Sequence, residues 1–288
     1  VVALTERSVV PAAHLRLALG LGGLTVEAAR CCTDKAAMKR AVRAAGLPCT
    51  DWVEAEEGLE ADAIVERLGL PIVLKRAVGS GGRGTRVART RAEVPDRLPT
   101  GGLAEAFIEG VEMSVEQVVA GGRVRFANPT QYLVPGWASV VPAPLPDADL
   151  RPVLDLAEAA RRALGVREGM THVEVFRTPV GPVFGELAAR PPGGHITALI
   201  QHAYGFDPWE TLLLVALGET PTLPERARQS AAVWILHPGE GTVRTVVGVE
   251  AARALPGGAE VTCRVAPGAA VRVRAGTGEE VGHLLVTG

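Results

Sequence analysis

A lysine and a run of glycines stand close together near residue 80, and this combination can hold a phosphate group. In the stretch LKRAVGSGGRG, residues 74–84, Lys75 precedes Gly79, Gly81 and Gly84. The backbone N–H groups of such a loop can face phosphate oxygens, and a lysine adds a compact positive charge. The glycines also fit the G-x-G-x-x-G spacing of a dinucleotide-binding turn, so three types of phosphate site have to be compared.

The neighbours of this loop favour a hairpin over the two better-known phosphate motifs. A P-loop requires its lysine directly after the last glycine, whereas Lys75 comes four residues before Gly79. A dinucleotide-binding turn requires a helix after the glycines, but residues 85–90, TRVART, alternate as a strand does. We therefore expect a glycine-rich loop between antiparallel strands that folds over a nucleotide. On this stretch alone, a flexible hairpin with a solvated lysine is an equal alternative.

Two glutamates form a second group of residues that could take part in chemistry. They lie in THVEVFRTPVGPVFGELAAR, residues 171–190. If the hairpin turn is centred on Val180, Glu174 lies opposite Glu186, with Cβ atoms about 4.5–5.5 Å apart. Two carboxylates this close repel each other unless a cation lies between them. Mg²⁺ held by one or two carboxylates and completed by substrate phosphates would satisfy both. The same register pairs His172 with Ala188 and Phe176 with Phe184.

The face that carries the glutamates holds two further polar side chains. Strand alternation places four residues on it: His172, Glu174, Glu186 and Arg190. Arg190 could therefore hold a phosphoryl group during its transfer. The apolar residues of the opposite face favour a half-buried strand over a solvated hairpin with an incidental acidic pair.

Lysine is rare in this chain, and its positions are therefore informative. Of the 30 basic residues only Lys35, Lys39 and Lys75 are lysines. A compact point charge that persists among arginines suggests a role that a guanidinium group cannot fill. The chance survival of three lysines is the alternative.

The elements that would position these residues alternate irregularly between helices and strands. A helix is expected over residues 34–46, from Asp34 to Gly46, and another over residues 60–68, ending at Gly69. Further helices are expected over residues 146–165 and about 207–217, and the strand-like stretches are PIVLKRAV, TRVART, LAEAFIEG, EMSVEQVVAGGRVRF, THVEVF and PVFGELAAR. This order indicates an α+β fold rather than a regular βαβ alternation.

Composition limits the class of protein. The chain has 288 residues, of which 47% are hydrophobic and 22% charged, enough for two domains and a large core. A net charge of −2 gives no sign of nucleic-acid or membrane-surface binding, and no apolar run could span a bilayer. The four cysteines lack C-x-x-C spacing, so reduced thiols in a cytoplasmic protein are expected. The chain starts on Val1 without a secretory signal, and we expect a preceding N-terminal part to be missing.

The glycine-rich hairpin with its preceding lysine and the paired-glutamate hairpin ending in arginine together resemble the ATP-grasp superfamily. The resemblance covers nearly the whole chain, and HVEVF with the β-rich end is most similar to the L-amino-acid (dipeptide) ligase branch. It implies an α+β ATP-grasp fold, in which two α+β subdomains grip ATP. The implied division is a remnant N-terminal segment at residues 1–33, the tail of a truncated pre-ATP-grasp domain; an ATP-grasp domain at 34–230 with its lid at about 70–107; and a small β-rich C-terminal subdomain at 231–288.

The resemblance also implies which residues bind ATP. DKAAMKRAVRAAGLPC and LPIVLKRAVGSGGRG are similar to segments whose lysines contact phosphates, which makes Lys35 and Lys75 the phosphate lysines. In the hinge-like stretch AEAFIEGVEMSVEQ, Glu105 would accept from the adenine amino group, the Ile108 backbone would meet the ring, and Glu112 would bind the ribose hydroxyls. The implied nucleotide set is Lys35, Lys75, Gly79, Ser80, Gly81, Gly82, Gly84, Glu105, Phe107, Ile108 and Glu112.

Metal, catalytic and substrate residues follow from the same resemblance. Glu174 and Glu186 are the implied ligands of Mg²⁺, or of Mn²⁺ in its place, and Arg190 and Lys75 the implied catalytic groups. The stretch RPPGGHI, residues 190–196, is expected to line the acceptor pocket. The implied substrate residues are His172, Arg190, Gly193, Gly194 and His195.

One position departs from the pattern E-x-N-x-R that the family usually has in the second metal strand. Ala188 stands where an asparagine usually binds the metal, and the chain's only asparagine is Asn128. Either water fills that coordination position, or His172, opposite Ala188 in the expected register, compensates. A nucleotide-binding homologue without ligase activity is therefore one alternative.

The resemblance implies the ATP-dependent joining of a carboxylic acid to an amine. The acid attacks the γ-phosphate of ATP, an amine captures the resulting acyl phosphate, and ADP and phosphate are released. Amino acids are the implied substrates, neither nucleic acid nor membrane is an implied partner, and a homodimer stays open. The run ARPPGGHIT also resembles purine-pathway members, so that a purine-pathway ligase or a carboxylase-like enzyme is a further alternative.

Overall fold

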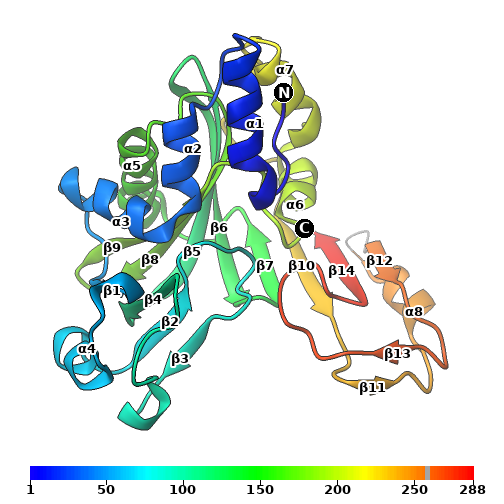
Figure 1. Ribbon diagram of the computed structural model, residues 1–288. Coiled ribbons are helices and arrows are strands. Elements are labelled where there is room, and N and C mark those ends of the chain that lie inside the picture. The colour runs from blue at the N-terminus through cyan, green and yellow to red at the C-terminus, as the bar shows by residue number, and fades with distance from the viewer. Residues whose placement is uncertain (257–259) are drawn as a thin grey trace.

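Two antiparallel sheets organise the molecule (Figure 1). The computed structural model describes residues 1–256 and 260–288. Within these residues eight strands pair in the order β12-β14-β10-β7-β6-β5-β8-β9, and four others in the order β1-β4-β2-β3. The large sheet consists of β5 (Val111–Ala120), β6 (Arg123–Val134), β7 (Ala138–Val141), β8 (Gly169–Thr178), β9 (Gly181–Ala188), β10 (Ala231–Leu236), β12 (Glu260–Cys263) and β14 (Gly282–Thr287). The small sheet consists of β1 (Trp52–Glu54), β2 (Ile72–Arg76), β3 (Arg86–Ala88) and β4 (Gly102–Ala106), and β11 (Gly241–Thr242) pairs with β13 (Ala270–Val271).

Helices cover both faces of the large sheet. The helices are α1 (Glu6–Ala18), α2 (Val26–Thr33), α3 (Lys35–Ala44), α4 (Ala61–Leu68), α5 (Asp147–Ala163), α6 (Ile196–Tyr204), α7 (Pro208–Ala216) and α8 (Val249–Arg253). The helices α2, α3 and α5 pack on β9, whereas α6 and α7 pack on strands of the opposite face. Among the residues described, none of the helices combines the length and apolar character that a membrane span requires.

The four helices expected from the sequence are present as α3, α4, α5 and α7. Helix α3 starts where Asp34 accepts hydrogen bonds from the backbone N–H groups of Ala36 and Ala37, and it ends before Gly46, whose φ is 72°. The glycine-rich loop also lies between antiparallel strands as expected, because Val73 of β2 pairs with Val87 of β3.

Three helices were not expected: α1, α2 and α6. Thr5 and Thr25 stand at the N-caps of α1 and α2, so the local start signals exist. Helix α1 also contains Pro11, and α6 begins after His195, whose left-handed φ of 63° replaces an ordinary cap. The residues before Asp34 therefore include two helices that pack on each other, and their assignment to the tail of a longer domain stays a prediction.

The β8–β9 hairpin confirms the predicted glutamate pair. Glu174 lies opposite Glu186, and His172 lies opposite Ala188. The four side chains are therefore brought together by two neighbouring strands, as the arithmetic on the sequence predicts.

The expected pairing of Phe176 with Phe184 is wrong, because the ladder shifts register after Glu174. Phe184 lies opposite Val175 instead. Gly185 occupies the irregular position, where a Cβ atom would come within 2.9 Å of the Phe176 ring. The turn is slightly displaced from the expected centre at Val180, because Thr178 pairs with Gly181. The register shift after Glu174 compensates for this displacement, so Glu174 still lies opposite Glu186.

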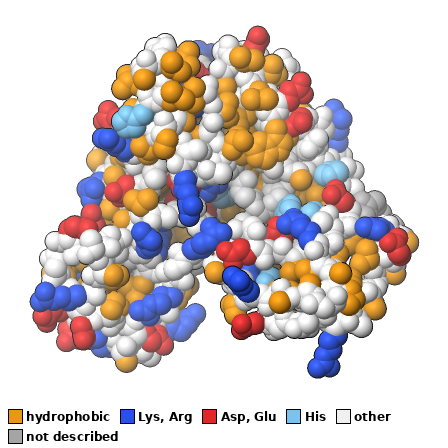
Figure 2. Space-filling model, turned by 45° about the vertical axis from the view of Figure 1, so that its right-hand side comes forward, with side chains coloured by type: hydrophobic (Ala, Val, Ile, Leu, Met, Phe, Trp, Pro, Cys, Tyr) orange, Lys and Arg blue, Asp and Glu red, His pale blue; other side chains and the backbone are white. Residues whose placement is uncertain are grey.

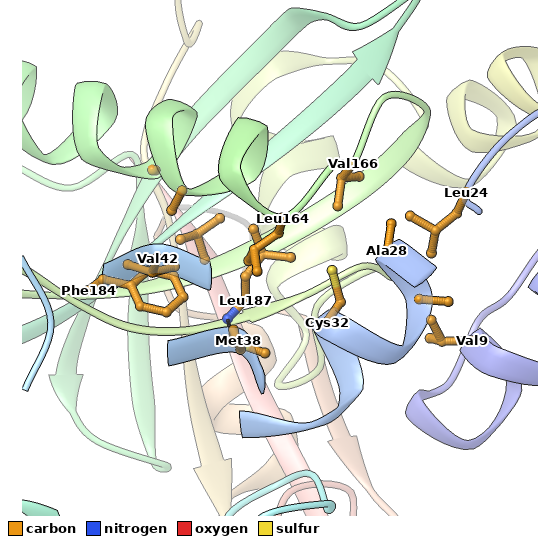
Figure 3. Packing of buried hydrophobic residues seen from close by; sticks show 14 of the residues in the cluster. Val9, Leu24, Ala28, Cys32, Met38, Val42, Leu164, Val166, Phe184 and Leu187 are labelled. Atoms are coloured by element: carbon orange, nitrogen blue, oxygen red, sulfur yellow. Dashed lines mark hydrogen bonds between the residues drawn. The ribbon is translucent and has the colours of Figure 1, made fainter. Parts of the chain in front are cut away.

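A buried hydrophobic core lies between α3, α5 and the β8–β9 hairpin (Figure 3). This core includes Met38, Val42, Leu164, Phe184 and Leu187, all of them buried. Met38 and Val42 occupy one face of α3, because residues four apart on a helix share a face. Lys35 and Lys39 are buried too, and together with Met38 and Val42 they follow the i, i+3, i+4, i+7 spacing of one helix face, so both lysines belong to the packed side of α3.

Residues after 230 extend the large sheet. Strand β10 pairs with β7 from Ala231–Val141 to Trp234–Ala138, and β14 and β12 follow. The ladder of β11 and β13 projects at the lower right of Figure 1. The hydrogen-bonded sheet continues across residue 230, and the predicted division there stays a prediction.

All four cysteines lie among the described residues and are free thiols.

Candidate active site

All three lysines of the chain converge on one site. Lys35 Nζ donates a hydrogen bond to the Gly79 carbonyl at 2.8 Å and lies 3.2 Å from Glu186 Oε1. Lys75 Nζ on β2 lies 2.9 Å from Glu105 Oε1, and Lys39 Nζ lies 3.3 Å from Glu105 Oε2. The structure therefore brings the two predicted phosphate lysines together and adds Lys39, which sequence reasoning left without a role.

The molecular surface has a notch between two lower lobes (Figure 2). Lys and Arg side chains gather at the head of this notch in the same view. Positive charge at the head of a notch is suited to an anionic ligand, because the low-dielectric walls focus the field there.

The opposed glutamates are already balanced by cations. Lys35 contacts Glu186, and His172 Nε2 lies 3.7 Å from Glu174 Oε1. Burial alone would raise the pKa of Glu174. The hydrogen bond and positive charge of His172, together with the positive charges of Lys75 and Lys35, outweigh burial and lower this pKa. Glu174 is therefore held as a carboxylate that is ready to bind a cation.

Glu112 has the opposite tendency, although it lies on the same face of the sheet. Burial and the negative charge of Glu174 raise the pKa of Glu112 to about 7. The predicted ribose contact therefore titrates near neutral pH.

A fully buried carboxylate, Glu116, holds His172 in place. His172 Nδ1 lies 2.9 Å from Glu116 Oε1 and donates to it. Three further donors complete the cluster: Ser114 Oγ at 2.6 Å, Asn128 Nδ2 at 2.9 Å and Thr130 Oγ1 at 2.5 Å. The chain's only asparagine thus belongs to this network beneath the glutamate pair and not to the pair itself.

Arg190 is held by a residue of the first helix. Its Nε donates to Glu6 Oε2 at 2.9 Å, and one of its terminal nitrogens donates to the Pro191 carbonyl. Burial raises the pKa of Glu6, and the charge of Arg190 opposes this rise. Glu6 was missed from the sequence, because nothing near it in the chain marks a partner on the far side of the sheet.

The lid loop, residues 77–85, contacts a C-terminal loop, residues 274–280. Gly81, Gly82 and Gly84 have φ angles of 69°, 71° and 75°, which only glycine adopts readily. Arg83 Nε lies 3.2 Å from Glu279 Oε1, and the Thr277 N–H donates to the Gly81 carbonyl at 3.4 Å. The predicted phosphate loop is therefore positioned partly by residues almost two hundred positions away.

The predicted substrate stretch also meets the C-terminal part of the chain. His195 Nε2 lies 3.2 Å from Glu280 Oε1, and its ring lies 3.9 Å from that of His283. Gly194 just before it has a φ of 63°. Glu280 and His283 were not expected near this stretch, because their segment was assigned to a separate unit.

The hinge residues follow the small sheet directly. Glu105 is the penultimate residue of β4 and is buried, whereas Phe107 is exposed and Ile108 half-buried where the chain crosses to β5. The Phe107 N–H donates to the Pro71 carbonyl at 3.1 Å. These positions fit an edge-on contact with a ring lying between the two sheets.

The residues present fit a nucleotide with a hard metal ion. Within the described part of the chain, no three side chains of His, Cys, Asp or Glu converge to hold a metal. Mg²⁺ needs only one or two carboxylates when phosphates complete its shell, and Glu174 and Glu186 supply two. The buried carboxylate of Glu105 has only ion pairs with Lys75 and Lys39, and its Oε1 atom makes no contact of hydrogen-bond geometry, so it can still accept a hydrogen bond from a ligand.

Comparison with known proteins agrees with this geometry. A model of the ATP-grasp domain matches residues 40–206, and a model of the L-amino acid ligase C-terminal domain 2 matches residues 233–288. An uncharacterised protein of Sinorhizobium fredii is 32% identical over 265 residues, which are 86% of this chain but 55% of that protein. The chain thus spans little more than half the length of that relative.

Two amino acid ligases of Bacillus are also similar. The L-arginine-specific L-amino acid ligase of Bacillus subtilis is 27% identical over 281 residues, which are 91% of this chain and 68% of that enzyme. The crystal structure of an L-amino acid ligase from Bacillus licheniformis has a TM-score of 0.81 at 21% identity, and it covers 99% of this chain and 75% of that one. With an ATP-grasp domain match across more than half of its residues and this shared fold, the chain belongs to the ATP-grasp family.

Proposed function

We propose that this chain is an ATP-dependent carboxylate–amine ligase with an amino acid among its substrates. The observation that supports it most is the opposed pair Glu174–Glu186 beside three lysines and Arg190. Similarity to an L-arginine-specific L-amino acid ligase supports the substrate class. A cytoplasmic location and a homodimer stay predictions.

The nucleotide would lie between the small sheet and the β8–β9 hairpin. Lys35 and Lys75 would exchange their present carboxylate partners for phosphates, and the N–H groups of the lid loop would face the same oxygens. The Glu105 carboxylate would accept from the adenine amino group, the Ile108 backbone would meet the ring, and Glu112 would bind the ribose.

Glu174 and Glu186 would hold Mg²⁺, or Mn²⁺ in its place. When bound, the ion would neutralise charge on the phosphate oxygens. Ala188 provides no side-chain oxygen at the position of the family's asparagine. Contacts with Glu116 and Glu174 raise the pKa of the opposite His172 to about 9, so at neutral pH both of its ring nitrogens carry protons and neither can bind a metal. Water at that coordination position is therefore the arrangement that the contacts support.

The reaction would proceed in two displacements. An oxygen of the acid attacks the γ-phosphorus, and the bond to the β–γ bridging oxygen breaks, so that ADP leaves with the electron pair. The amine then attacks the carbonyl carbon of the acyl phosphate, phosphate leaves with the C–O electron pair, and the amine releases a proton. Arg190, oriented by Glu6, would bind the transferred phosphoryl group, and the closed lid loop would exclude water.

ADP release tests this proposal directly. ADP formation should require both a carboxylic acid and an amine across a panel of paired amino acids, and mass spectrometry should detect the amide product. Glu186→Ala should lower turnover at least about a hundredfold and spare much of the ADP affinity. Glu66→Ala, at an exposed position of α4, is the matched control and should leave both unchanged. ADP release that never depends on an acid and an amine would refute ligation.

A second candidate is a nucleotide-binding homologue without ligase activity. Ala188 favours it, because the family's usual metal contact is missing there. In that case ADP and Mg²⁺ would bind with Glu186-dependent affinity, but no acid or amine would stimulate ADP release.

A further inference from the structure

Lys39 is a basic residue whose side chain is buried by the surrounding protein. Its side chain is 1% exposed, and its Nζ makes no hydrogen bond although it lies 3.3 Å from Glu105 Oε2. Burial lowers the pKa of Lys39, and the negative charge of Glu105 opposes this effect. A buried ammonium group is costly unless it is paired, so its one close carboxylate matters.

Glu105 lies between two ammonium groups, one of which is more exposed than the other. Its Oε1 is 2.9 Å from Lys75 Nζ, and its Oε2 is 3.3 Å from Lys39 Nζ. Lys75 is 14% exposed and stands next to the lid loop, where phosphates would attract it. Lys39 lies on α3 and is closed off from solvent, so it would stay beside Glu105 if Lys75 turned toward the phosphates.

The carboxylate of Glu105 can distinguish two classes of purine. An ionised carboxylate only accepts hydrogen bonds. Adenine presents an amino group at its 6-position, which donates, whereas guanine and hypoxanthine present a carbonyl oxygen there, which accepts. A carboxylate fixed in its ionised form therefore attracts the first and repels the second.

We propose that Lys39 is a specificity-determining residue, which holds Glu105 as a fixed acceptor and thereby makes the site prefer adenine to 6-oxopurine nucleotides. The inference rests on the proposed function, since it concerns how that site reads its nucleotide. Lys39 acts through Glu105 and not by touching the base.

Nucleotide binding in the absence of acid and amine tests the proposal. Isothermal titration should show that the wild type binds ADP at least about tenfold more tightly than inosine diphosphate. Lys39→Met keeps the length of the side chain but removes its charge, and it should weaken ADP binding about tenfold or more with little effect on inosine diphosphate. Purine riboside diphosphate, which lacks both the 6-amino group and the 6-oxygen, should bind more weakly than ADP but more tightly than inosine diphosphate.

The controls separate this role from a structural one. Lys39→Arg keeps the charge and should retain a preference for ADP, and it decides the matter if Lys39→Met does not fold. Equal losses for all three nucleotides, or no loss in Lys39→Met, would overturn the role of Lys39 while leaving the proposed function intact. A wild type that binds no nucleotide, or all three equally, would overturn the inference, and the absence of all binding would also overturn the proposed function.

Discussion

At the scale of single residues, charge near the glutamate pair is set by hydrogen bonds rather than by exposure. Burial alone would lower the pKa of His172, but its contacts with Glu116 and Glu174 raise it to about 9. Glu116 shows the complementary effect, since hydrogen bonds from His172, Ser114 and Thr130 overcome burial and lower its pKa. An imidazolium therefore stands between two carboxylates at neutral pH.

Glu116→Gln should lower the pKa of His172 from its value of about 9, because a neutral amide no longer favours the imidazolium and Glu174 alone remains to do so. Nuclear magnetic resonance of the His172 ring against pH, without metal or nucleotide, measures this change. The raised pKa of His172 also adds stability that is complete below about pH 6.5 and is lost as the pH rises through about 9.

The same substitution should therefore reduce the fall in the free energy of unfolding between these two pH values. Glu168→Gln is the matched control, since Glu168 accepts from the Gly121 N–H outside this network. A titration midpoint of His172 that stays near 9 in Glu116→Gln would show that Glu116 does not set its charge.

How much of the site could be predicted depended on where the partners of each residue lie. Glu174 and Glu186 are separated by one tight turn, so strand arithmetic was enough to pair them. Lys39 and Glu6 gave no such signal, because their partners Glu105 and Arg190 arrive from distant segments of the chain. Local spacing thus predicts a residue only when the fold brings it to a near neighbour.

At the scale of elements, the lid loop and the C-terminal loop contact each other and hold the lid in its closed position. Thr277 and Glu279 contact Gly81 and Arg83, and Gly276 packs closely against the Gly81 carbonyl. A loop held in this way closes only when its counterpart is in place. The lid loop therefore depends on the segment between β13 and β14, close to the end of the chain.

Gly276→Ala should hold the lid loop open, because a Cβ atom there would lie 2.7 Å from the Gly81 carbonyl oxygen. Such overpacking costs about 1–3 kcal/mol, which should raise trypsin cleavage after Arg83 about tenfold. Gly22→Ala is the control, since a Cβ atom at Gly22 meets nothing within 4 Å. Equal cleavage rates in wild type and Gly276→Ala would mean that the two loops are not coupled.

At the scale of the whole molecule, the large sheet unites segments that the sequence seemed to separate. Strand β10 covers the edge of β7, and Val233 and Leu285 join the same buried cluster as Phe126 and Ile200. Residues from before and after position 230 therefore contribute to the one buried hydrophobic cluster between the strands and α6.

A chain that ends at Ser230 should fail to fold cooperatively, because it exposes the edge of β7 and the cluster under α6. Circular dichroism during heating should show no sharp transition, and gel filtration should show aggregates. Cooperative unfolding of residues 1–230 would instead identify residues 231–288 as an independent unit.

The fold was predictable where its signals are local. Asp34 and Gly46 bound α3 through capping, and the α+β class followed from the order of elements. The assignment of the C-terminal strands was not, because pairing between β10 and β7 joins segments that lie far apart in the chain. Sheet membership is a long-range property, and hydrophobic alternation shows only that a segment is a strand.

The convergence of Lys35, Lys39 and Lys75 has a consequence for protein chemistry. Because the chain has no other lysine, acylation, acetylation and cross-linking of lysine side chains can occur only in this one site. The three side chains are 9%, 1% and 14% exposed, so an amine-reactive reagent should label them slowly. Protection of these amines by a nucleotide would then report occupancy of the site with almost no background from the arginine-rich surface.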